Sequence, residues 1–131
     1  MDKNKFVVFL ICLITPMLYQ RVKFLFFHKS FHKIALRKRS GLQIHHGHYG
    51  ILIVFAATLI FLFAGKNNVV LVGTFGFGWG LVLDEIIPSL LMPGKDRHLE
   101  LRIYGLSEVR TYWLFFLVIM LVAILYMFFG A

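Results

Sequence analysis

The feature that most constrains this chain is a block of apolar residues, from Tyr112 to Gly130, that contains no charged side chain. A helix of that length can cross the hydrocarbon core of a bilayer, and the aromatic pair Tyr112 and Trp113 suits a membrane interface. The chain is 60% hydrophobic and only 15% charged, which leaves too little polar surface to enclose a soluble core. We therefore predict an integral membrane protein.

Three further apolar segments complete the predicted membrane domain. All four are long blocks, unlike the short alternating segments of a membrane β-barrel, so helices are expected. A basic stretch with apolar residues at helical spacing follows the first block, which is typical of a helix lying along the membrane surface. The prediction is a single all-α domain, residues 1–131, with transmembrane helices at about 6–20, 49–65, 69–92 and 112–130 and an interfacial helix at about 21–39.

Basic residues concentrate in two of the predicted loops. Residues 21–39 and 95–110 hold most of the Lys and Arg, whereas the connection at 66–68 holds a single lysine. With four spans both basic loops lie on one side of the membrane, and the positive-inside rule assigns that side to the cytoplasm. We expect a prokaryotic inner-membrane protein with both termini outside, although Lys3 and Lys5 weakly oppose this orientation.

The formal net charge of +8 indicates an anionic partner. Because the basic residues stand between apolar blocks, they are placed to contact lipid headgroups rather than a polynucleotide. We predict membrane lipids as partners and no nucleic acid.

Three histidines cluster just before the second predicted span, in the segment Gln43-Ile44-His45-His46-Gly47-His48-Tyr49-Gly50. Imidazoles are common ligands of zinc, iron and copper. On a helix His45 and His48 share one face, while His46 points elsewhere. The alternative without a metal is that these side chains only form hydrogen bonds with headgroups or backbone.

Two adjacent acids, Asp84 and Glu85, stand in the otherwise apolar third span, where an unpaired charge costs several kcal/mol. Gly76, Gly80 and Asp84 recur every four residues, so Asp84 should point into the bundle from a smooth helix face. Glu85 is turned about 100° away and is expected to reach towards the headgroups. A structural ion pair of Asp84 with Arg102 or Arg110 is the simpler alternative.

The two motifs reach similar depth in the membrane. Counted from the short connection, His48 and Asp84 lie about 26 and 22 Å along their helices. Imidazoles and carboxylates together suit a divalent transition metal such as zinc or iron. The predicted metal ligands are His45, His46, His48, Asp84 and His98, although no H-E-x-x-H run makes this spacing specific.

A resemblance to known proteins rests on two segments, Gly41-Leu42-Gln43-Ile44-His45-His46-Gly47-His48 and Gly76-Phe77-Gly78-Trp79-Gly80-Leu81-Val82-Leu83-Asp84-Glu85. Their pairing resembles small multi-pass proteins of bacteria and archaea described only as integral membrane proteins. The likeness covers roughly the middle third of the chain. It implies that the two motifs form one unit, and it implies no particular reaction.

Three functions remain open on the sequence. The first is a metal-dependent hydrolase of a lipid or lipid phosphate, with Asp84 and Glu85 as catalytic residues and Arg97, Arg102 and Arg110 as the phosphate-binding residues. The second is a non-enzymatic lipid-binding or scaffold subunit that docks a partner helix or a second copy through the Gly73/Gly76/Gly80 face. The third is ion or proton translocation by an oligomer.

Overall fold

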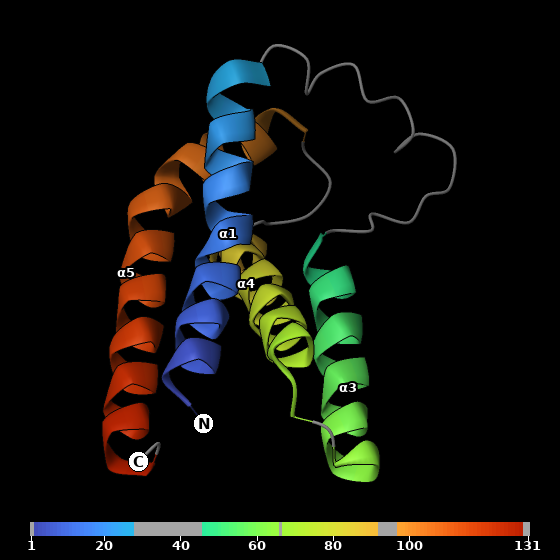
Figure 1. Ribbon diagram of the computed structural model, residues 1–131. Coiled ribbons are helices and arrows are strands. Elements are labelled where there is room, and N and C mark those ends of the chain that lie inside the picture. Colours follow the sequence, from blue (N-terminus) through green and yellow to red (C-terminus); the bar gives the residue numbers. More distant parts are fainter. Residues whose placement is uncertain (1, 28–45, 66, 92–96, 130–131) are drawn as a thin grey trace.

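All regular structure in the described residues, 2–27, 46–65, 67–91 and 97–129 of this computed structural model, is helical (Figure 1). The helices are α1 (Lys3–Phe27), α3 (His46–Ala64), α4 (Val69–Leu91) and α5 (Arg97–Phe129). Four segments in them are long and apolar enough to cross a membrane, Lys3–Lys23, His46–Ala64, Val69–Ile87 and Glu108–Phe129. The all-helical character and the four membrane-length helices agree with the sequence prediction.

Two helices are longer than predicted. Residues 21–27 continue α1, so no separate interfacial helix begins at residue 21, and residues 28–39 of that predicted helix lie outside the described part of the chain. The helix α5 starts at Arg97, well before the predicted span at 112. Its polar first turns contain good helix formers and no proline, so charge made this stretch resemble a loop without breaking the helix.

Polar side chains and one glycine define several helix ends. The Asp2 carboxylate accepts a hydrogen bond from the Lys5 backbone N–H at 2.9 Å, which caps α1 and lowers the pKa of Asp2. Asn68 caps α4 in the same way, because its Oδ1 accepts from the Leu71 N–H at 2.8 Å. Gly65 follows α3 with a φ of 59°, a left-handed conformation that glycine adopts readily.

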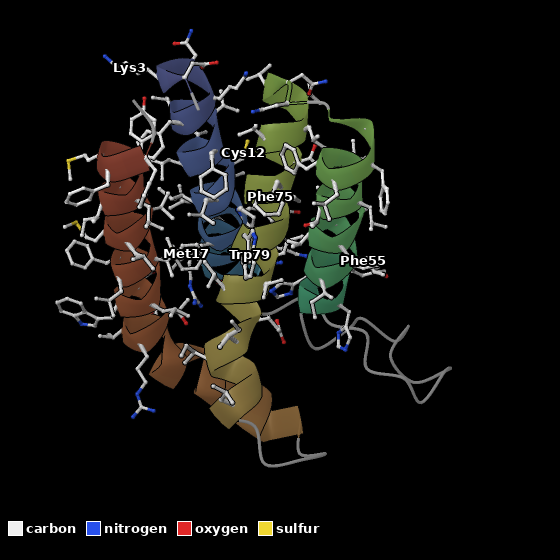
Figure 2. The ribbon with its side chains drawn as sticks, turned by 90° about the horizontal axis from the view of Figure 1, so that it is seen from below. Lys3, Cys12, Met17, Phe55, Phe75 and Trp79 are labelled. Carbon is white, nitrogen blue, oxygen red and sulfur yellow. The ribbon has the colours of Figure 1, made fainter. Side chains whose placement is uncertain are left out.

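The helix α4 is the centre of the bundle. It packs against α1 on one side and α3 on another, and α5 runs beside α1 and α4 (Figures 1 and 2). Both termini lie at the same end of the bundle as the connection between α3 and α4 (Figure 1). The ends of α1 and α4 and the starts of α3 and α5 therefore share the opposite end, as four antiparallel spans require.

Glycines allow α4 to approach both neighbours closely. On the α1 side, a Cβ atom added to Gly76 would lie 2.7 Å from the Phe9 carbonyl oxygen, and one on Gly80 would collide with the Leu13 carbonyl oxygen. On the α3 side, a Cβ atom on Gly50 would lie 2.7 Å from the Gly78 carbonyl oxygen. The predicted docking face Gly73/Gly76/Gly80 is thus covered by α1 of the same chain, and another chain would have to displace α1 to use it.

Aromatic and aliphatic side chains fill the rest of the interior. Phe75 of α4 bridges two helices, since its ring centroid lies 6.3 Å from that of Phe9 and 5.7 Å from that of Phe61. Where α1, α4 and α5 meet, a buried cluster forms from Leu13, Met17, Leu83 and Phe115. This cluster lies next to the polar residues described below.

Candidate functional site: a polar layer at one end of the bundle

Above the buried apolar cluster the helix interiors become polar. Each helix in the described part of the chain contributes at least one side chain to this polar layer. Its members are Arg21, His46, Asp84, Glu85, Glu108, Thr111 and Tyr112. Each buried residue of the layer continues a row of apolar or small residues along one face of its own helix. Arg21 lies one turn beyond Met17 on α1, and Thr111 one turn before Phe115 on α5.

The two carboxylates lie on different faces of α4. Asp84 extends the Gly76 and Gly80 stripe, which packs on α1. Glu85 extends the stripe of Gly78 and Leu81, which packs on α3. Two adjacent residues therefore reach two different neighbouring helices.

Asp84 forms a buried ion pair with Arg21. The Arg21 Nη2 and Asp84 Oδ1 atoms lie 3.6 Å apart, and the two side chains are only 9% and 0% exposed. Taking both charges out of water costs several kcal/mol for each ion, which their attraction offsets only when the remaining polar atoms are satisfied. Whether those atoms have hydrogen-bond partners therefore decides whether this ion pair is stabilising.

His46 joins both acids from α3. Its Nε2 atom lies 3.2 Å from Asp84 Oδ2 and 3.0 Å from Glu85 Oε2. The neighbouring Gly47 makes this approach feasible, because a Cβ atom there would lie 2.9 Å from the Glu85 Cβ. The histidine motif and the acidic motif therefore form one unit in space, as the sequence predicted.

Tyr112 of α5 closes the layer over Arg21. The Arg21 guanidinium carbon lies 5.7 Å from the centre of the Tyr112 ring, within range of a cation–π contact. The Tyr112 hydroxyl donates a hydrogen bond to Glu108 Oε1 at 2.6 Å, one turn back along the helix. Tyr112 thus connects the buried guanidinium to a carboxylate near the surface.

Three buried polar atoms of the layer lack a hydrogen-bond partner among the described side chains. They are Arg21 Nε, Arg21 Nη2 and Asp84 Oδ1. The Nε–H and Nη2–H groups point from one edge of the guanidinium, the edge that binds carboxylate or phosphate through two hydrogen bonds. Unsatisfied buried groups of this kind are rare in native proteins and call for a ligand or a solvent molecule.

The structure brings together some predicted site residues and separates others. His46, Asp84 and Glu85 meet, whereas His48 and Arg110 are exposed. His45 lies outside the described residues, and so do the side chains of His98, Arg97 and Arg102.

The structure corrects two expectations about side-chain direction. His46, which was expected to point away from the face of His45 and His48, faces the acids, because α3 places residue 46 against α4. Glu85 is buried against His46 and does not reach the headgroups. Asp84 pairs with Arg21 of α1, whereas Arg110 is exposed on α5. The side chain of Arg102, the other partner considered, lies outside the described residues.

The described side chains supply no complete metal site. Among them, no group of three His, Cys, Asp or Glu residues is arranged to hold a metal ion. The predicted ligand set includes His45 and His98, which lie beyond what the structure describes. A zinc or iron centre therefore stays a prediction.

Sequence reasoning missed Arg21, Thr111 and the role of Tyr112 as a cover for Arg21. A signal was available, since Leu13, Met17 and Arg21 recur every four residues and mark one face of α1. Searches against protein-family models, curated proteins and solved structures found no match. The resemblance to small prokaryotic membrane proteins accordingly remains a prediction.

Proposed function

We propose that this protein binds the phosphate group of an anionic lipid headgroup at the polar layer, with Arg21 as the anchoring cation. The observation that carries the proposal is that the Arg21 side chain is only 9% exposed, yet its Nε and Nη2 atoms have no hydrogen-bond partner. Those two donors match the spacing of two phosphate oxygens, a pairing that lysine cannot provide.

The position of the layer supports a lipid ligand. The layer lies at the bundle end opposite to the termini, where the two basic stretches of the sequence leave and re-enter the helices. Positive charge near a membrane surface attracts anionic lipids by about 1 kcal/mol per Lys or Arg. On the basis of the same charge distribution, we place this end at the cytoplasmic face of a prokaryotic inner membrane and both termini outside.

The test compares lipid affinity in two variants that keep the charge. The purified, delipidated protein is titrated with phosphatidylglycerol in detergent, and bound lipid is counted by native mass spectrometry. Arg21→Lys should weaken binding about tenfold, because it keeps the positive charge beside Asp84 but loses the two-donor edge. Lys23→Arg, on the same helix two residues away, is the matched control and should bind like the wild type.

Two further binding measurements identify the ligand. Glycerol phosphate and inorganic phosphate are added as competitors, and displacement of the lipid at equal concentrations would assign the site to a soluble phosphate. Phosphatidylcholine, which has no net charge, should bind more weakly than phosphatidylglycerol. If Arg21→Lys and Lys23→Arg bind phosphatidylglycerol equally well, Arg21 is a structural residue and the proposal is wrong.

A metal-dependent hydrolase of a lipid or lipid phosphate is the second candidate. One observation favours it, namely that an imidazole and two carboxylates meet within 3.2 Å at His46 Nε2. In this scheme a zinc or iron ion would activate water beside Asp84 and Glu85. Elemental analysis of untagged protein tests it, with His46→Ala as the variant and His32→Ala as the control. Stoichiometric metal that only His46→Ala removes would favour the hydrolase, and wild-type protein without metal would end it.

A further inference from the structure

The polar-layer atoms that lack a hydrogen-bond partner are not all donors. Arg21 Nε and Nη2 need an acceptor, but Asp84 Oδ1 is fully buried and needs a donor. A phosphodiester anion offers only acceptor oxygens, so by itself it would satisfy Arg21 and face Asp84 with a second negative charge. The ligand that satisfies all three atoms must supply a hydrogen-bond donor as well.

A hydroxyl group is the donor that suits the pair, because it can also accept a hydrogen bond from the guanidinium, which an ammonium group cannot. Arg21 Nη2 and Asp84 Oδ1 lie 3.6 Å apart, slightly too far for a direct hydrogen bond. A single hydroxyl oxygen at about 2.8 Å from both atoms would accept from the guanidinium and donate to the carboxylate. The same oxygen would separate the Asp84 charge from a phosphate bound at the Nε edge of Arg21.

The other oxygen of Asp84 explains why the carboxylate holds this position. Asp84 Oδ2 lies 3.2 Å from His46 Nε2, so the carboxylate is held between α1 and α3 with its Oδ1 directed at Arg21. His46 is itself held by Glu85 at 3.0 Å. The unpaired acceptor is therefore a fixed feature of the layer and not the free end of a flexible chain.

We infer that the polar layer selects an anionic headgroup that carries a hydroxyl next to its phosphate, such as a glycerol or another polyol headgroup. Arg21 binds the phosphate oxygens, and Asp84 accepts a hydrogen bond from the hydroxyl group. This inference rests on the proposed lipid-binding function and adds the chemical class of the headgroup.

Matched lipids test the inference without altering the protein. Phosphatidylglycerol and phosphatidylmethanol carry the same single negative charge, and only the first has headgroup hydroxyls. Wild-type protein should bind phosphatidylglycerol about tenfold more tightly, the difference expected for one hydrogen bond to a buried charged group. Phosphatidic acid, which carries its O–H on phosphorus, distinguishes the two sources of the donor. Affinity equal to that of phosphatidylglycerol would assign the donor to phosphorus and overturn the polyol assignment.

Two variants place the preference on Asp84. Asp84→Val removes the acceptor and should bind both lipids equally, whereas Asp84→Asn keeps a neutral acceptor and should retain part of the preference. Asp2→Asn, which alters a carboxylate before the first residue of α1, at the opposite end of the bundle, should leave the preference unchanged.

The outcomes separate the two proposals. Equal binding of both lipids by the wild type, with loss of affinity in Arg21→Lys, would overturn the hydroxyl inference, leave the anionic site intact and indicate that a buried water fills the gap. No effect of Arg21→Lys on either lipid would overturn the site itself. If Asp84→Val does not fold, the comparison of the two lipids on the wild type still decides the inference.

Discussion

Two faces of α4 pack closely on neighbouring helices and each ends in a carboxylate, but the two carboxylates have different partners. The face towards α1 carries Gly76 and Gly80 and ends in Asp84, while the face towards α3 carries Gly78 and ends in Glu85. Glycines bring the backbones together in both cases, and a carboxylate at the end of each stripe reaches a cationic or hydrogen-bonding partner on the neighbouring helix. The glycines of α4 therefore serve two faces, because the predicted face Gly73/Gly76/Gly80 packs on α1 and Gly78 adds a second close contact with α3.

The difference between the faces lies in burial and in the partner. The α1 face buries a full ion pair, with Arg21 9% and Asp84 0% exposed. The α3 face pairs Glu85 with an imidazole whose side chain is 22% exposed. Breaking the first pair leaves a charge inside the bundle with no partly exposed partner, whereas in the second pair the His46 imidazole is exposed enough for water or headgroups to reach it. We expect the α1 face to dominate stability.

The largest effect is expected from removing one member of the buried ion pair. Arg21→Met should lower the free energy of unfolding by about 3–5 kcal/mol, because Asp84 remains buried without a cation. The double variant Arg21→Met, Asp84→Leu should recover most of that loss. Unfolding in a denaturing detergent, followed by circular dichroism, measures both values. Equal losses in the single and double variants would show that the pair is not coupled.

A smaller effect should follow from widening the contact between α4 and α1. Gly80→Ala places a methyl group against the Leu13 backbone, which cannot move without shifting the helix, and should cost about 1–3 kcal/mol. Gly73→Ala is the control on the same face, because its new methyl group would meet only the side chains of Cys12 and Val8 at 3.2 Å. The same unfolding assay ranks them, and a larger loss in Gly73→Ala would contradict the proposed packing.

The smallest effect is expected on the α3 face. Gly47→Ala pushes α3 away from Glu85 and should cost no more than about 1–2 kcal/mol, since His46 is partly exposed and can be solvated instead. Nitrogen NMR of the His46 imidazole should change clearly in this variant, and much less in Gly73→Ala. A stability loss as large as that of Arg21→Met would remove the distinction between the faces.

Long apolar blocks made most of the fold predictable. They fixed the number and approximate positions of the helices, and the spacing of Gly76, Gly80 and Asp84 correctly turned Asp84 inwards. Helix ends were less predictable, because the charged residues after Arg97 resemble a loop by composition although they continue a helix. The residue composition of a segment indicates whether it contacts water more directly than it indicates whether it is helical.

The site was only partly predictable. A basic residue near the end of a span usually extends towards the headgroups, so Arg21 was assigned to the surface, and only its contact with Asp84 shows otherwise. The choice of His46 over His48 depends on the rotation of α3 against α4, which a single sequence does not specify. Pairs between helices require the packing geometry, whereas each partner by itself was visible in the sequence.

The central claim is that the buried guanidinium of Arg21 contacts a lipid phosphate, and magic-angle-spinning NMR can measure that contact directly. Protein labelled with ¹⁵N-arginine is placed in phosphatidylglycerol bilayers, and ¹⁵N–³¹P dipolar dephasing is compared with that of the Arg21→Lys variant. The account predicts a guanidinium signal that dephases strongly against phosphorus in the wild type and is missing from the variant. Identical dephasing in the two proteins would show that Arg21 does not contact lipid phosphate, and would contradict the account.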